Sequence, residues 1–124
     1  MSDTRGKLST WGGSVVRGHD GKFHMFSAQM THNTGIVVWM SNSRIRHAVS
    51  TTGPYGPYEP RDIAFGLWGH EPTVARAPTG EYVLFWTAHF GEEVPCSGVP
   101  RSSMYGPAVA VAPGSWSATQ PQPV

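Results

Sequence analysis

An internal repeat is the feature that most limits how this chain can fold. When the sequence is shifted along itself by about sixty residues, residues 11–17 align with residues 70–76 without a gap. The alignment continues from residues 20–26 onto residues 79–85. The identical pairs are Val15/Val74, Arg17/Arg76, Gly21/Gly80 and Phe26/Phe85. We therefore interpret the chain as two units of one repeated structure.

Each unit has the sequence pattern of a β-hairpin. Residues 15–17 are a short β-branched run, and His19-Asp20-Gly21 is a turn sequence in which the glycine supplies a positive φ. Residues 22–29 then alternate between two sets of side chains, and both sets contain an aromatic residue. A strand of this kind is expected to be covered on both faces. The second unit repeats the pattern with the more apolar run 82–86.

Further short strands are expected at residues 45–50, 61–67 and 108–112. Residues 31–43 are ambiguous, because a loop sequence precedes a short apolar run, and residues 91–105 have the composition of a loop. A repeat of about sixty residues that holds several short strands has the size of one propeller blade.

This pattern divides the chain into four parts. Residues 1–10 are expected to be a flexible N-terminus, 11–69 one blade, 70–116 a second blade that lacks its last strand, and 117–124 a disordered tail. Two units leave apolar sheet faces uncovered, because repeat stacking usually needs at least three units. The chain is therefore expected either to be a piece of a longer propeller or to associate with copies of itself.

Composition and charge exclude several classes of protein. The 15 glycines and 11 prolines among 124 residues favour turns and short strands over helices. A formal net charge of +1 argues against a nucleic-acid binder, which normally carries a basic stripe. The single cysteine, Cys96, rules out an internal disulfide. The sequence contains neither a secretory signal pattern nor an apolar run near the roughly twenty residues that a membrane helix needs, and the compartment stays open.

The order and spacing of the motifs resemble the five-bladed β-propellers of glycoside hydrolase family 43. The segments that carry this resemblance are 11–14, 20–26, 45–50, the Gly-Pro-aromatic segment 56–58, 70–85, and a second Gly-x-aromatic segment at 114–116. The resemblance covers residues 11 to about 116, which would be two of the five blades. It implies an all-β fold and an activity on carbohydrate. The family also suggests an extracellular location, for which the chain itself gives no sign.

In this family the catalytic groups project from the inner-strand starts around a central cavity. A pair of carboxyl groups hydrolyses the glycosidic bond, and a third carboxylate tunes the general acid. The corresponding starts here are 11–13 and 70–72, and only Glu71 is an acid there. The family usually has aspartate at the matching position, so the carboxyl of Glu71 is displaced by one methylene. Glu71 is thus the candidate catalytic residue, but the catalytic set is incomplete, and whether the chain is an enzyme stays open.

Four residues are candidates for binding the substrate. Trp11 can stack on a pyranose ring, or it can fill the propeller axis as core. His70, beside Glu71, can form the edge of a sugar pocket, or the pair can bond only to neighbouring backbone. His32 and His47 complete the candidates. A metal site would require His32, His47 and His89 to converge, which the sequence does not indicate. No metal or cofactor is expected, although some such propellers carry an axial calcium ion.

Three functions therefore remain open from the sequence. The first is a carbohydrate-active propeller that hydrolyses or binds a poly- or oligosaccharide. The second is a non-catalytic module that binds carbohydrate or protein, which the absence of an acid at the Trp11 start favours. The third is a truncated, inactive fragment. The expected partners are carbohydrate and either further blades or further copies of the chain, and neither nucleic acid nor membrane.

Overall fold

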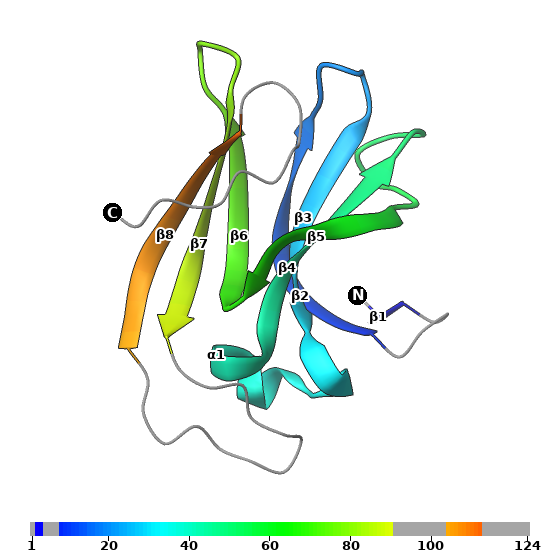
Figure 1. The fold of residues 1–124 in the computed structure, drawn as a ribbon. Helices are drawn as coiled ribbons and strands as arrows, with labels where there is room; N and C mark the ends of the chain where they lie inside the picture. Colours follow the sequence, from blue (N-terminus) through cyan, green and yellow to red (C-terminus); the bar gives the residue numbers. More distant parts are fainter. Residues whose placement is uncertain (1, 4–7, 91–103, 113–124) are drawn as a thin grey trace.

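The structure is a computed structural model that describes residues 2–3, 8–90 and 104–112, with side chains described between residues 9 and 88 except at 33 and 67. The chain forms two antiparallel β-sheets with very little helix (Figure 1). The expected all-β fold class is confirmed. The loop expected at 91–105 lies largely outside the described residues, and the tail at 117–124 and the aromatic segment at 114–116 lie wholly outside them.

The first sheet has five strands in the order β1-β2-β3-β4-β5. Their bounds are β1 Ser2–Asp3, β2 Leu8–Arg17, β3 Phe23–Met30, β4 Ser43–Ser50 and β5 Glu59–Leu67. The second sheet has the order β6-β7-β8, with β6 Gly69–Arg76, β7 Tyr82–Phe90 and β8 Met104–Ala112. The strands expected at 45–50, 61–67 and 108–112 are present, and β2 begins at Leu8, before the expected start at Trp11.

The ambiguous segment between β3 and β4 folds as three short helical turns. These are η1 Thr31–Asn33, η2 Ile36–Val38 and α1 Trp39–Asn42. The apolar run at 36–39 is too short for its hydrophobic pattern to distinguish helix from strand. Within the described residues, no helix has the length and apolar character to cross a membrane.

The two hairpins share one strand register, which is the structural form of the repeat. Ser14 pairs with Phe26 in the first sheet, and adding 59 to both numbers gives the pair Thr73 and Phe85 in the second. The turns match as well: Gly18 N–H donates to the carbonyl of Lys22 at 2.8 Å, and Ala77 N–H donates to the carbonyl of Glu81 at 2.8 Å. Equivalent sequence positions therefore occupy equivalent backbone positions.

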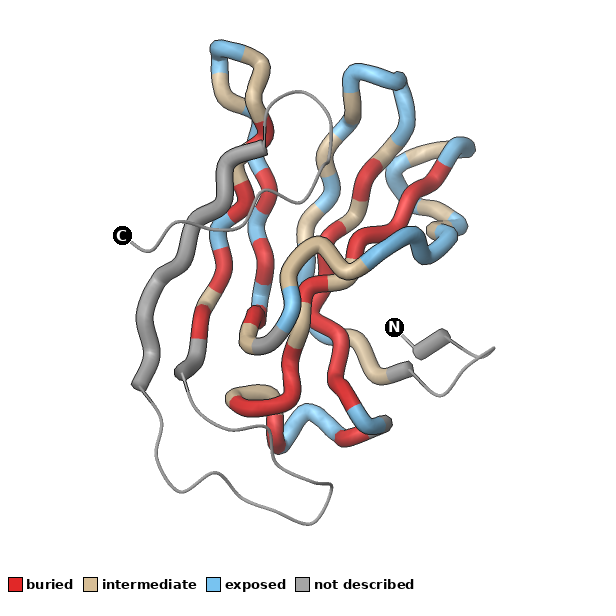
Figure 2. The backbone as a smooth tube through the Cα atoms, in the orientation of Figure 1, coloured by how far each residue is buried: buried red, intermediate tan, exposed pale blue. Residues whose placement is uncertain are grey.

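The two sheets pack against each other through a single apolar core (Figure 2). Its buried members from both sheets are Phe26, Ile45, Val74, Leu84, Trp86 and Ala88. Alternation along a strand places successive side chains on opposite faces. In β7 the buried set is therefore Tyr82, Leu84, Trp86 and Ala88, whereas Phe85 points away from the first sheet and is exposed.

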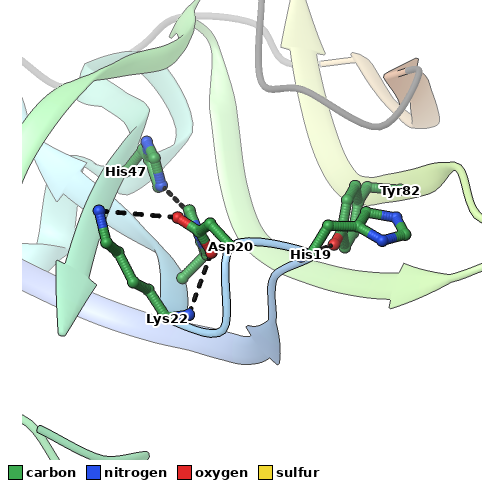
Figure 3. Close-up of polar contacts among 6 residues, drawn as sticks. His19, Asp20, Lys22, His47 and Tyr82 are labelled. Carbon is green, nitrogen blue, oxygen red and sulfur yellow. Dashed lines mark hydrogen bonds and ion pairs between the residues drawn. The ribbon is translucent and has the colours of Figure 1, made fainter. Parts of the chain in front are cut away.

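Polar contacts at the β2–β3 turn join the two sheets at one end (Figure 3). His19 N–H donates to the hydroxyl of Tyr82 at 2.9 Å, and the His19 ring contacts Arg76 and the carbonyl of Gly80. Within the turn, Lys22 N–H donates to Oδ1 of Asp20 at 3.0 Å. These contacts fix the turn end, and strands β2 and β6 start at the other end.

Candidate functional site: the paired bulges of β2 and β6

The first strand of each repeated hairpin, β2 in the first sheet and β6 in the second, carries a bulge at the same repeat position. The pairing of β2 with β3 shifts register between Trp11 and Ser14, and that of β6 with β7 shifts between His70 and Thr73. A bulge redirects side chains and is frequent beside functional sites. Both bulges lie at the starts from which the sequence predicted substrate contacts.

The glycines of the first bulge permit its backbone shape. Gly12 has φ +54° and Gly13 has φ +145°, and a Cβ on Gly13 would lie 2.5 Å from the carbonyl oxygen of Phe26. A side chain at Gly13 would therefore collide with β3. In the second bulge Glu71 adopts φ 49°, which is uncommon for a residue with a side chain.

The two bulges lie side by side. A Cβ on Gly12 would lie 3.4 Å from Cγ of Glu71, an ordinary van der Waals distance, so Gly12 and Glu71 are neighbours across the two sheets. Nearby, the hydroxyl of Ser14 accepts a hydrogen bond from the N–H of Val74 at 2.6 Å and donates to the carbonyl of Pro72 at 3.3 Å. Ser14 therefore ties the backbones of β2 and β6 together next to Glu71.

Trp11 stands on the first bulge with 55% of its surface exposed. It lines a surface hollow of about 400 Å³ together with Thr10, Gly12, Met25 and Ser27. Of the two roles open for Trp11, exposure fits stacking on a ligand better than filling a core.

Glu71 is exposed, and it is isolated from the other acids whose side chains are described. Asp20 and Glu81 belong to the turns at the far ends of the hairpins, and Glu59 and Asp62 belong to the outer strand β5. Among these described acids, Glu71 alone lies at the bulge of β2 or β6.

His70 is buried beneath the second bulge rather than open to solvent. Its Nδ1 lies 2.7 Å from the hydroxyl of Ser43, and its ring stacks on Trp39 with a centroid distance of 4.5 Å. Burial lowers the pKa of His70, and the nearby charge of Glu71 opposes this shift. A neutral His70 therefore supports the strand start that presents Glu71.

His47 is also buried, on β4. Its Nε2 lies 2.9 Å from Nδ1 of His24, and its Nδ1 lies 3.0 Å from Oδ1 of Asp62. Burial lowers the pKa of His47, against the raising effect of Asp62. Asp20 Oδ1 lies 3.1 Å from Nε2 of His24, so an Asp–His–His–Asp array crosses the sheet.

His32 lies in η1 and is exposed, with φ 51°. The η1 turn follows the end of β3, which pairs with the start of β2, so His32 belongs to the same end of the sheet as Trp11. The side chain of His89 lies outside the described part of the chain. No group of three or more potential ligands converges to hold a metal ion within the described residues.

The structure therefore places the bulge that follows Trp11 next to the bulge that carries Glu71, and it buries His70 beside Glu71 in the second bulge. It puts His47 in the interior of the first sheet. The roles of Ser14 and Trp39 were not anticipated from the sequence. Only the alignment of Gly12-Gly13 with Glu71-Pro72 in the repeat carried a signal for the paired bulges.

Comparison of the chain with protein-family models, with curated proteins and with solved structures gives no match.

Proposed function

We propose that this chain is a carbohydrate-binding protein built from two propeller-type blades, and that the sugar binds at the paired bulges. The observation that carries the proposal is the placement of an exposed tryptophan and an exposed carboxylate on adjoining bulges of two sheets. A sugar ring offers an apolar C–H face to an aromatic ring and hydroxyl donors to a carboxylate. Trp11 then stacks on the ring, and Glu71 accepts hydrogen bonds from its hydroxyls.

The blade assignment rests on the repeat. Each unit is a twisted antiparallel sheet, its inner strand carries the bulge, and the two inner strands pack next to each other through the Ser14 bridge. In propellers such inner strands surround the ligand site. The resemblance to family 43 glycoside hydrolases points to the same class of ligand.

Hydrolysis by the same site is the second candidate. The left-handed backbone of Glu71 favours it, since such strain is concentrated at functional sites. Glycosidases, however, act through two carboxyl groups about 5–9.5 Å apart. Glu71 has no such partner among the acids with described side chains, so binding is the function that these residues support best.

Isothermal titration calorimetry with xylohexaose, cellohexaose and maltohexaose tests the proposal. We expect saturable binding of at least one of them, weakened about tenfold or more by Trp11→Ala, which removes the stacking surface. Tyr55→Ala is the matched control, because Tyr55 is a 95% exposed aromatic residue in a turn outside the site. No binding to any of the three sugars, or equal losses for both variants, would refute this role for Trp11.

A further assay separates binding from hydrolysis. If the chain hydrolyses a bound oligosaccharide, new reducing ends appear, and Glu71→Gln abolishes them while binding persists. We expect binding without new reducing ends.

A further inference from the structure

The two sheets of this chain contact each other through different faces of the repeat unit. In β3 the even-numbered positions, among them Phe26 and Ala28, face the second sheet. In β7 the even-numbered positions, among them Leu84 and Trp86, face the first sheet. Since the repeat offset of 59 is odd, Leu84 corresponds to Met25 and not to an inward-facing residue of β3. The packing is therefore head-to-tail.

Head-to-tail packing leaves one unused face on each sheet. The second sheet exposes the face that carries Phe85, which is the counterpart of Phe26. Phe26 is 0% exposed between the sheets, whereas Phe85 is 46% exposed. We call this the knob face, and it consists of Thr73, Val83, Phe85 and Thr87.

The first sheet leaves the complementary face partly open. Val15, Met25 and Ser27 are the counterparts of Val74, Leu84 and Trp86, all three of which are buried against the first sheet. Val15 is exposed, Met25 is half-buried and Ser27 is buried, and Met25 and Ser27 both line the hollow of about 400 Å³. We call Val15, Met25 and Ser27 the hollow face.

We propose that the knob face of one molecule docks on the hollow face of a second copy of this chain, in the same arrangement that joins the two sheets within the molecule. Phe85 then occupies, against Met25 of the second copy, the position that Phe26 holds against Leu84. A heterologous contact of this kind generates closed rings or open chains rather than symmetric dimers. The proposal does not depend on carbohydrate binding.

The hydroxyl of Thr73 on the knob face can also repeat a polar contact that joins the two sheets within the molecule. Ser14 bridges the carbonyl of Pro72 and the N–H of Val74. Its counterpart Thr73 is exposed, and after docking its hydroxyl is set to bridge the equivalent carbonyl of Gly13 and N–H of Val15 in the second copy. The repeat offset of 59 alone fixes which hydroxyl, carbonyl and N–H groups form this bridge.

The turn contacts do not repeat. His19 contacts Arg76 and Gly80 across the sheets, but its counterpart in the second unit is Pro78, which has no ring donor or acceptor to offer. The contact between copies is therefore expected to be weaker than the contact within the chain, and to dissociate on dilution.

Sedimentation and light-scattering mass of the intact chain, measured over a wide concentration range, test the proposal. We expect a mass above that of the monomer that rises with concentration. Phe85→Glu removes the knob and Met25→Glu blocks the hollow, so each variant alone is expected to be a monomer. Tyr55→Glu adds the same charge at an exposed aromatic site in a turn, and it should associate like the unchanged chain.

Mixing the two monomeric variants gives the sharpest outcome. The Phe85→Glu chain retains its hollow face and the Met25→Glu chain retains its knob face, so the mixture should form a one-to-one dimer that grows no further. A symmetric interface predicts instead that one variant associates by itself. As a milder test should a glutamate variant fail to fold, Thr73→Val is expected to weaken association about tenfold through the lost hydroxyl bridge.

Three results would overturn the proposal. One is a monomer at every concentration, the second is association that survives both glutamate variants, and the third is a mixture of variants that stays monomeric. Because Trp11 lines the same hollow, added sugar is also expected to lower the mass if both proposals hold.

Discussion

Glu71 is the residue at which stability and proposed function oppose each other. Its φ of 49° lies in the left-handed region, where a side chain costs roughly 1–2 kcal/mol and glycine costs little. We expect Glu71→Gly to raise the free energy of unfolding by about 1 kcal/mol and to weaken sugar binding. Glu71→Gln should leave stability unchanged. Urea unfolding measures both, and a loss of stability in the glycine variant would mean that the glutamate side chain itself stabilises the bulge.

His70 gives the molecule a predictable dependence on pH. Because burial lowers its pKa in the folded state, the unfolded chain binds the proton first, near the ordinary histidine pKa of about 6.5. The contribution of neutral His70 to stability is therefore complete above about pH 6.5 and is lost as the pH falls toward the lower folded-state pKa. Thermal unfolding between pH 7.5 and about 5 should show a falling midpoint, with a smaller slope in His70→Gln. An equal slope in that variant would exclude His70 as a source of the effect.

At the scale of elements, strands β2 and β6 hold the two sheets in register through Ser14. Ser14→Ala leaves the N–H of Val74 and the carbonyl of Pro72 without this partner, and it should lower the free energy of unfolding by about 1–3 kcal/mol. Ser14→Thr is the matched control, because threonine occupies the equivalent position 73 and keeps the hydroxyl. Equal losses in the two variants, by chemical denaturation, would show that volume rather than hydrogen bonding matters there.

The glycine pair of the first bulge allows a second test at this scale. Gly13→Ala places a Cβ 2.5 Å from the carbonyl oxygen of Phe26, so β2 and β3 must separate locally. We expect a loss of at least about 2 kcal/mol in the free energy of unfolding. Gly53→Ala is the control, since a Cβ there meets nothing within 4 Å. A tolerated alanine at position 13 would contradict the bulge geometry.

The elements could be anticipated from the sequence to different degrees. The hairpins could be anticipated, because the Asp20-Gly21 turn and the alternation of side chains beside it are determined by residues close together in the sequence. The helical turns at 36–42 could not, because a short apolar run is compatible with either structure. The burial of His70 could not either, since its contacts with Ser43 and Trp39 join segments distant along the chain.

At the scale of the whole molecule, the repeat relates features of the two sheets that neither sheet explains by itself. The same offset of 59 relates the hairpin registers, places the two bulges side by side and identifies the two unused faces. Trp11 and Glu71 were named from the sequence through their position in the repeat, and the structure places them on adjoining bulges. The residues that surround Trp11 and Glu71 could not be named from the sequence, because which faces of the two sheets meet cannot be deduced from the pattern within a single strand.

The most direct measurement of the proposed function is an NMR titration of the intact chain with the best-binding oligosaccharide, following the tryptophan indole N–H signals. The signal of Trp11, assigned by its loss in Trp11→Phe, should shift with saturation, whereas that of Trp86, buried between the sheets, should stay in place. Such a result would locate the sugar at the paired bulges. Saturable binding that leaves the Trp11 signal unmoved would contradict the central claim, because the sugar would then lie elsewhere.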